Sequence, residues 1–348
     1  MKILIKENPW FLALIAIALY SLVSVCYNSV ATAEAETLLS GKILFNELNF
    51  STNSQIPSSP LAPIILGLGD ALFGITGARI IAILFALISV VFFYELVRSF
   101  LKDTPSSFLS TIVFVSSSSF LFLGKTATFE IISLTFFIIF LYISQRKQEL
   151  PETSHSVDIL SAVFLFLAIS TNFLLFVFVP FLIVGVLISS RRKRFYIPLI
   201  ILVVLIVGFI FSFPTTISKF QLLFNNPKQE VPFIFRIISL FQYIIIPLIL
   251  LTAMFTDRAR YHHTNKIYYI FFGLAFLVFA VLLVNGDHSS GGRNITFAVL
   301  FLSPLTGVVL KDYLQRQGTT KMTVIVVLFA VFLLSFYKVR LLENSYPN

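Results

Sequence analysis

Long runs of apolar residues are the feature that most constrains this sequence. They are about 16 to 23 residues long, and a helix of about 20 apolar residues crosses the hydrocarbon core of a bilayer. Of the 348 residues, 57% are hydrophobic and only 12% are charged, whereas a soluble domain carries about 25% charged residues. We therefore predict an all-α, polytopic membrane protein, whose length is divided into spans and not into soluble domains.

About eleven transmembrane helices are expected within a single transmembrane domain, 1–348, with the N-terminus in the cytoplasm and the C-terminus outside. The predicted spans are Trp10–Tyr27, Arg79–Val97, Pro105–Leu123, Phe129–Ser144, Val157–Thr171, Asn172–Ser190, Phe195–Pro214, Pro232–Phe255, Ile267–Val284, Asn294–Leu310 and Met322–Tyr337. The two spans on either side of Thr171–Asn172 depend on that polar pair forming a turn, and one long tilted helix is the alternative. Pro60–Phe73 is apolar but short, and its prolines, glycines and acidic Asp70 indicate an interfacial or re-entrant helix.

The distribution of positive charge supports this topology. It leaves about two thirds of the 25 Lys and Arg residues on the cytoplasmic side, which is the bias seen in short loops of membrane proteins. If Pro60–Phe73 spanned the membrane, most of these residues would lie outside. The net charge of +9 therefore reflects topology, and no basic stripe with interleaved aromatic residues indicates nucleic acid as a partner. The single cysteine, Cys26, excludes an intrachain disulfide.

This topology gathers polar residues on the extracytoplasmic face, in outer loops predicted at 28–79, 214–231 and 285–293. The first of these is the longest segment that is neither a span nor a cytoplasmic connection. Charged groups near the bilayer boundary are costly and usually face a cavity or a partner. The candidate site residues on this face are Asn28, Glu34, Glu36, Arg79, Lys125, Glu130, His288 and Arg293.

The candidate catalytic residues are three carboxylates. Glu34 and Glu36 point about 200° apart around a helix, so at most one of them faces a given cavity, and Glu34 is preferred. Glu130 lies one or two residues into a predicted span. It is either a boundary carboxylate paired with Lys125 or a group that faces a cavity and binds substrate hydroxyls.

The candidate substrate-binding cations are Arg79, Lys125 and Arg293, which lie where the phosphate of a lipid-linked substrate would sit. Arginine suits phosphate because its planar fork donates two parallel hydrogen bonds. The alternative is that Arg79 and Lys125 only reach toward lipid headgroups. His288 has one neighbouring ligand, Asp287, and no clear third, so no metal is expected.

Four segments in a fixed order carry a family resemblance: LLSGKI, SSPLAPIILGLGDALFGITGARIIAILFALISVVFFYELV, GKTATFEIISLTFFIIFLYI and GGRNITFAVLFLSPLTGVV. In this order they resemble the GT-C superfamily of integral membrane glycosyltransferases. The most similar branch contains protein O-mannosyltransferases and lipid A aminoarabinose transferases. The resemblance puts Phe73-Gly74 and Arg79 at the start of the second span, Glu130 at the acid of the second outer loop, and Arg293 near a basic residue that contacts the lipid phosphate.

The resemblance implies transfer of a sugar, with inversion, from a polyprenyl-phosphate-linked donor to a lipid, glycan or protein acceptor. The reaction would take place on the extracytoplasmic face of a prokaryotic plasma (inner) membrane, among membrane lipids and without a cofactor. Glu34, or less favourably Glu36, would take the acceptor proton, and Glu130 would orient the substrate. Asn28, at the place of the family's acidic pair, and His288 are expected to contact the substrate.

Two alternatives to an active transferase remain at this stage. Because Asn28 does not ionise, the chain is in one alternative a catalytically impaired partner subunit that binds a lipid-linked sugar. The other alternative is a transporter of lipid or sugar. Transporters often contain inverted repeats and acids near the bilayer midplane, whereas this chain has no evident repeat and its acids cluster at one face.

Overall fold

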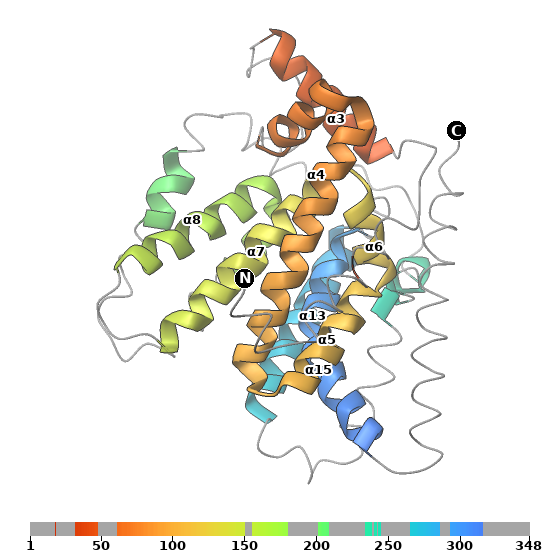
Figure 1. Ribbon diagram of the computed structural model, residues 1–348, viewed down its shortest axis with the longest axis vertical. Coiled ribbons are helices and arrows are strands. Elements are labelled where there is room, and N and C mark those ends of the chain that lie inside the picture. The colour runs from red at the N-terminus through yellow and green to blue at the C-terminus, as the bar shows by residue number, and fades with distance from the viewer. Residues whose placement is uncertain are drawn as a thin grey trace. The chain divides into compact units, whose positions relative to one another are not determined.

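The structure is a computed structural model, and every element in the residues that it describes is a helix (Figure 1). It describes residues 18, 32–47, 61–149, 155–179, 201–208, 234–238, 240–241, 243–244, 265–285 and 293–315. Three helices in these ranges are long and apolar enough to cross a membrane, and a bent pair would make a fourth. The predicted all-α, polytopic membrane fold is confirmed, while the total of eleven spans stays a prediction.

The chain divides into two compact units, which are described separately here. One, the N-terminal-loop unit, contains Val30–Leu96 and Thr126–Asn226. The other, the C-terminal unit, contains Met1–Ser29, Val97–Lys125 and Pro227–Asn348. The single domain expected from the sequence stays a prediction.

In the N-terminal-loop unit, helix α3 (Thr32–Glu47) crosses the beginning of α4 (Leu61–Leu101) at two glycines. A Cβ atom on Gly41 would lie 2.7 Å from the carbonyl oxygen of Pro63 and 3.1 Å from the Cα of Gly67. Only glycine permits this approach, so the small-residue sequence LLSGKI fixes where the two helices meet. The salt bridge between Lys42 and Asp70, 3.3 Å long, joins the same two helices.

Helix α4 is two helices joined at a sharp break. Phe73 and Gly74 have non-helical backbone angles, and Gly74 has a φ of 63° and a ψ of −160°. Residues with a Cβ atom rarely adopt this conformation. The break separates the short apolar segment before Phe73 from a long helix that begins four residues ahead of the predicted start at Arg79. The carbonyl of Gly69 packs directly against Gly77 across the break.

Hydrogen bonds from buried side chains connect the other helices of this unit, α4, α7 and α8. Ser89 of α4 and Thr135 of α7 (Phe129–Glu149) are 2.8 Å apart between their side-chain oxygens. Ser133 of α7 donates to the carbonyl of Ala168 in α8 (His155–Thr171) over 3.2 Å. Helix α8 ends at Thr171, and Asn172 caps the following 3₁₀ helix η1 (Phe173–Phe178), as the predicted turn requires. The predicted course of Asn172–Ser190 lies mostly outside the described residues.

The predicted span Pro105–Leu123 is bent in the C-terminal unit, where it consists of α5 (Thr104–Val115) and α6 (Ser118–Lys125) at an angle of 65°. Whether the pair forms one broken span stays a prediction. The run of four serines at 116–119 explains the bend. Ser116 donates to the carbonyl of Ile112, and Ser117 donates to the carbonyl of Phe114 and accepts from the backbone N–H of Phe120. Serine hydroxyls that bond to nearby backbone compete with the helix and form caps.

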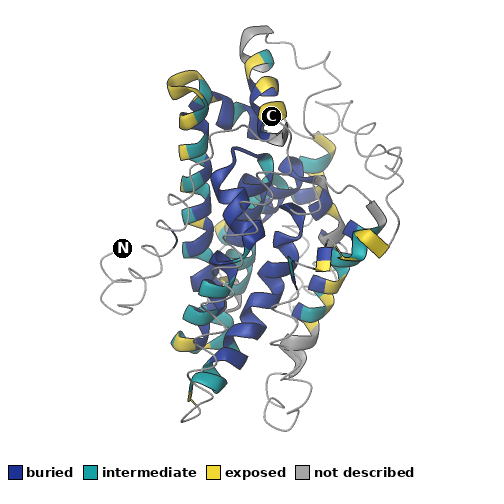
Figure 2. Ribbon diagram, turned by 90° about the vertical axis from the view of Figure 1, so that its right-hand side faces the viewer, coloured by how far each residue is buried: buried dark blue, intermediate teal, exposed yellow. Residues whose placement is uncertain are grey.

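Helix α15 (Thr296–Gln315) is the buried centre of the C-terminal unit and packs on α5 and on α13 (Asn265–Asn285). Gly307 allows the close approach of α5, since a Cβ atom there would lie 2.6 Å from both the carbonyl oxygen of Ser106 and the backbone nitrogen of Ser110. Phe271 of α13 contacts Phe301 of α15, with ring centroids 6.1 Å apart. In Figure 2 several of the described helices carry buried residues along one side and exposed residues along the other.

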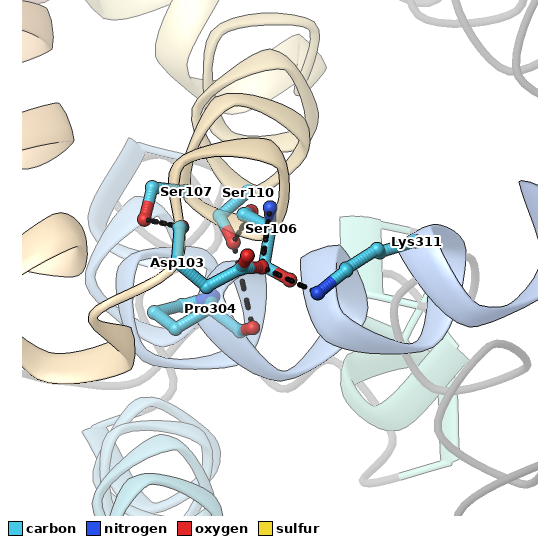
Figure 3. A network of polar contacts seen from close by, with 6 residues as sticks. All are labelled: Asp103, Ser106, Ser107, Ser110, Pro304 and Lys311. Carbon is cyan, nitrogen blue, oxygen red and sulfur yellow. Dashed lines mark hydrogen bonds and ion pairs between the residues drawn. The ribbon is translucent and has the colours of Figure 1, made fainter. Parts of the chain in front are cut away.

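One end of the α5–α15 pair is closed by a polar network around Asp103 (Figure 3). Asp103 caps α5 by accepting from the Ser106 N–H over 3.0 Å, and its carboxylate lies 3.0 Å from the ammonium of Lys311. Burial raises the pKa of Asp103, but the hydrogen bonds from Ser106 and Lys311 outweigh it, so the pKa lies below its ordinary value of 3.8. Ser110 also donates, over 3.4 Å, to the carbonyl of Pro304.

Candidate functional site

Helix α3 turns one carboxylate inward and the other outward. Glu34, Thr37 and Leu38 are buried, whereas Glu36 is exposed, which follows the 3.6-residue period of a helix. Glu34 has no exposed surface. The expectation that Glu34 and Glu36 cannot share one cavity therefore agrees with the arrangement, and Glu34 is the inward member of the pair.

The buried carboxylate of Glu34 is bound by Arg79 through two parallel hydrogen bonds. Nε of Arg79 donates to Oε1 over 2.9 Å, and Nη2 donates to Oε2 over 2.8 Å. The side chain of Arg79 is 17% exposed and that of Glu34 is fully buried. A two-pronged pair of this kind is the strong form of a charge-assisted hydrogen bond. It joins α3 to the long part of α4, 45 residues further along the chain.

A third donor reaches the same carboxylate from the connection between α6 and α7. The backbone N–H of Ala127 donates to Oε1 of Glu34 over 2.9 Å. Ala127 is the middle residue of a tight turn in which the Thr128 N–H donates to the Thr126 carbonyl over 2.8 Å. Glu34 therefore brings together three segments: α3, α4 and the turn that precedes α7. We name this group of Glu34, Arg79 and Ala127 the Glu34 junction.

Two further polar side chains follow the turn. Thr128 and Glu130 are completely buried at the beginning of α7. The hydroxyl of Thr128 has no hydrogen-bond partner in the part of the chain that the structure describes. A buried hydroxyl without a partner costs about 1–3 kcal/mol, so Thr128 is a candidate contact for a ligand. The start of α7 therefore holds two buried polar side chains, Thr128 and Glu130.

Two cations that the sequence singled out lie in the C-terminal unit. Lys125 is the last residue of α6 and is 3% exposed. Arg293 is 7% exposed, and its carbonyl accepts from the hydroxyl of Thr296 over 2.7 Å at the beginning of α15. Snorkelling toward headgroups would leave such side chains largely exposed. Their burial argues instead for a role inside the protein.

The remaining predicted site residues, Asn28 and His288, lie outside the described residues. Within the described ranges no three His, Cys, Asp or Glu side chains gather where a metal ion could bind. The sequence did not predict that Ala127 contributes its backbone N–H, because no residue type is required for a backbone donor. It also did not pair Glu34 with Arg79, although their opposite charges on neighbouring elements were a usable signal.

The described helices are those of a polytopic membrane protein, as the sequence predicted: α3 packs on the start of α4, and apolar helices follow. Comparisons with known proteins support the resemblance to the GT-C glycosyltransferases at the level of the fold. Residues 57–217, less than half of the chain, match the family described as dolichyl-phosphate-mannose-protein mannosyltransferase.

Two solved structures have the same fold. The crystal structure of ArnT from Cupriavidus metallidurans bound to undecaprenyl phosphate matches with a TM-score of 0.64 and 16% sequence identity. The same protein in the apo state matches with a TM-score of 0.62 and 14% identity. Each match covers 97% of this chain and 73% of ArnT. No curated protein sequence matches this chain.

Proposed function

We propose that this protein transfers a sugar from a polyprenyl-phosphate-linked donor to an acceptor on the extracytoplasmic face of a prokaryotic plasma membrane. The GT-C fold, the mannosyltransferase family match and the undecaprenyl phosphate bound to ArnT support this class of donor. The observation that carries the proposal is the Glu34 junction. It is a completely buried, fully oriented carboxylate in the first outer loop, where this fold is expected to carry its acidic residues.

The proposed reaction is a single displacement that inverts the anomeric carbon. An acceptor hydroxyl attacks this carbon while the bond from the carbon to the phosphate oxygen breaks. The bonding electron pair leaves with the phosphate, and the acceptor proton passes to a protein carboxylate. Fixed cations near the departing phosphate lower the barrier by stabilising the charge that grows on its oxygens. In this proposal Lys125 and Arg293 are those cations, with Asn28 and His288 as further substrate contacts.

We propose different roles for the two buried carboxylates, Glu34 and Glu130. Glu34 accepts three hydrogen bonds, which leaves at most part of its Oε2 free to accept a proton. We therefore assign the positioning of the Ala127 turn to Glu34 and Arg79, with proton acceptance by Glu34 as the secondary assignment. Glu130, two residues beyond Thr128, is the preferred proton acceptor. The free hydroxyl of Thr128 is proposed to bind a hydroxyl of the sugar or of the acceptor.

A catalytically impaired partner subunit is the second candidate function, and one observation favours it. The carboxylate of Glu34 is occupied by Arg79 and Ala127, and Asn28 stands where the resemblance expects an acid. Under this reading the buried polar groups bind a lipid-linked sugar without transferring it. The two functions differ in whether the purified chain releases polyprenyl phosphate.

The test is a transfer assay with purified protein in lipid nanodiscs and a polyprenyl-phosphate sugar of defined structure. The measured quantity is the polyprenyl phosphate released per protein molecule. Glu130→Gln is expected to abolish release and Glu34→Gln to reduce it by at least tenfold. The exposed Glu36→Gln is the matched control, because it makes the same chemical change on the outward side of α3 and should retain wild-type turnover.

The outcomes separate the two functions. Release by the wild type that is lost in Glu130→Gln supports the transferase. Donor binding without release, over several preparations and several sugars, supports the partner subunit. If Glu34→Gln and Glu130→Gln both turn over like Glu36→Gln, the assignment of these carboxylates is refuted.

A further inference from the structure

The break in α4 exposes an apolar tip at the end of the first outer loop. The tip, Ala71–Thr76, has the sequence ALFGIT and contains no charged residue. Leu72 is 72% exposed and Phe73 is 74% exposed, the highest values for large hydrophobic side chains in the described part of the chain. Exposed apolar groups of this size in contact with water are unfavourable and usually mark an interaction surface.

The tip continues the outer side of a helix that crosses the membrane. Beyond the break, Ile80, Leu84 and Ile88 are 50%, 53% and 40% exposed, and their spacing of four places them along one side of α4. A membrane span that presents apolar side chains outward presents them to lipid. The tip is therefore continuous with a lipid-facing surface.

The position of the break along α4 determines how deep the break lies in the bilayer. The helix from the break to Arg98 rises about 36 Å at 1.5 Å per residue. The hydrocarbon core is about 30 Å thick, and the headgroup layers add roughly 5–7 Å on each side. With Arg98 at one edge of the core, the break lies in the headgroup layer at the other edge. Leu72 and Phe73 can reach the hydrocarbon boundary from this height.

The tip is also rigidly connected to the helix that carries the Glu34 junction. Gly69 packs against Gly77 on the two sides of the break, and α3 crosses this hairpin at Gly41 with no room for a Cβ atom. The Lys42–Asp70 salt bridge adds a polar link immediately before the tip. The depth of the tip in the bilayer therefore sets the depth of α3.

From these observations we infer that Leu72 and Phe73 insert into the boundary between headgroups and acyl chains, and that this tip anchors the first outer loop at a fixed height on the bilayer. The partner of this surface is membrane lipid. The inference depends on the α4 span and not on the proposed transfer reaction. It goes beyond the expectation of an interfacial segment by naming the two residues that enter the lipid.

The test uses tryptophan fluorescence, which does not require enzymatic activity. The chain has a single tryptophan, Trp10, so a Trp10→Phe background allows one new tryptophan to be placed at will. Phe73→Trp reports on the tip. Leu84→Trp is the control inside the span, and Ala35→Trp is the control on the exposed side of α3. Each variant is reconstituted into phosphatidylcholine vesicles with bromine atoms near the headgroup end or near the terminus of the acyl chains.

The inference predicts a blue-shifted emission for Phe73→Trp, with stronger quenching by bromine near the headgroups than by bromine near the chain ends. Leu84→Trp should be quenched by the deeper bromine, and Ala35→Trp by neither. Quenching of Phe73→Trp by aqueous iodide instead of bromolipid would place the tip in water and overturn the inference. A blue-shifted tryptophan that neither reagent reaches would mean that protein covers the tip, which also overturns it.

Discussion

Replacement of Glu34 by glutamine tests the Glu34 junction through stability as well as activity. The substitution keeps the size of the side chain but removes the charge that Arg79 faces. An amide nitrogen cannot accept a hydrogen bond, so one of the two bonds from Arg79, each of which is 2.8–2.9 Å long, is also lost. Arg79 then loses the buried carboxylate that it binds through two hydrogen bonds.

The magnitude follows from the burial of the pair. Removing one partner of a buried ion pair costs about 3–5 kcal/mol. The side chain of Arg79 retains 17% exposure, so water screens part of the charge and the lower end of the range, about 3 kcal/mol, is expected. This is about a hundredfold change in the ratio of folded to unfolded protein, since about 1.4 kcal/mol corresponds to a factor of ten.

The assay is a double-mutant cycle in detergent micelles, with unfolding by heat or by a denaturing detergent followed by near-ultraviolet circular dichroism. Glu34→Gln combined with Arg79→Gln removes both charges and should recover about 1–3 kcal/mol relative to the sum of the single changes. Glu36→Gln, on the exposed side of α3, should stay within about 0.5 kcal/mol of the wild type. Equal stabilities of Glu34→Gln and Glu36→Gln, or strict additivity in the cycle, would show that Glu34 and Arg79 do not form a buried, coupled pair.

Three further predictions concern the elements that carry the site. Gly307→Ala should destabilise the protein by about 1–3 kcal/mol because its Cβ would overlap the backbone of Ser110. Gly273 lies in open space, so Gly273→Ala should be neutral or stabilising by up to about 1 kcal/mol. Thermal unfolding compares the two variants. Gly74→Ala should cost about 1–3 kcal/mol from backbone strain alone, since no atom crowds this position, and the same measurement applies. The free energy of unfolding should be higher for wild type than for Asp103→Asn above the ordinary carboxyl pKa of 3.8, and this difference should disappear as the pH falls below it. Unfolding measured as a function of pH tests this.

Each of these predictions has a contradicting result. Equal melting temperatures for Gly307→Ala and Gly273→Ala would show that α5 and α15 are not in close contact. An unchanged melting temperature for Gly74→Ala would mean that α4 is not broken there. For Asp103 the sign follows from a folded-state pKa that is lowered: the ionised form is the stabilising one, and it is lost on acidification. A stability difference that grew below pH 3.8 would contradict the network in Figure 3.

The sequence predicted those parts of the fold that depend on long patterns. Apolar runs located α7 and α15, and the polar pair Thr171–Asn172 marked the end of α8, because length and hydrophobicity alone decide whether a helix can span a bilayer. The separation of Pro60–Phe73 from the following span also agrees with the break at Phe73 and Gly74. The break itself is caused by the backbone conformation of Gly74, which a hydropathy pattern cannot predict.

The parts that sequence reasoning did not predict depend on short-range chemistry and tertiary contact. The bend between α5 and α6 arises from serine hydroxyls that bond to their own backbone, an effect invisible in an apolar average. For the site, helical periodicity predicted that Glu34 and Glu36 would not share one cavity, and in the structure Glu34 is buried and Glu36 exposed. The pairing of Glu34 with Arg79 and Ala127 required the fold, since the three residues lie in separate segments.

The proposed transfer from a polyprenyl-phosphate-linked sugar at the extracytoplasmic face is tested most directly with sealed proteoliposomes in which the orientation of the protein has been determined by labelling. A radiolabelled donor is presented on one side of the membrane at a time, and released polyprenyl phosphate is measured. The account predicts release only when the donor shares the side of the first outer loop, and its loss in Glu130→Gln. Release from the opposite side, or none from either side, would contradict the account.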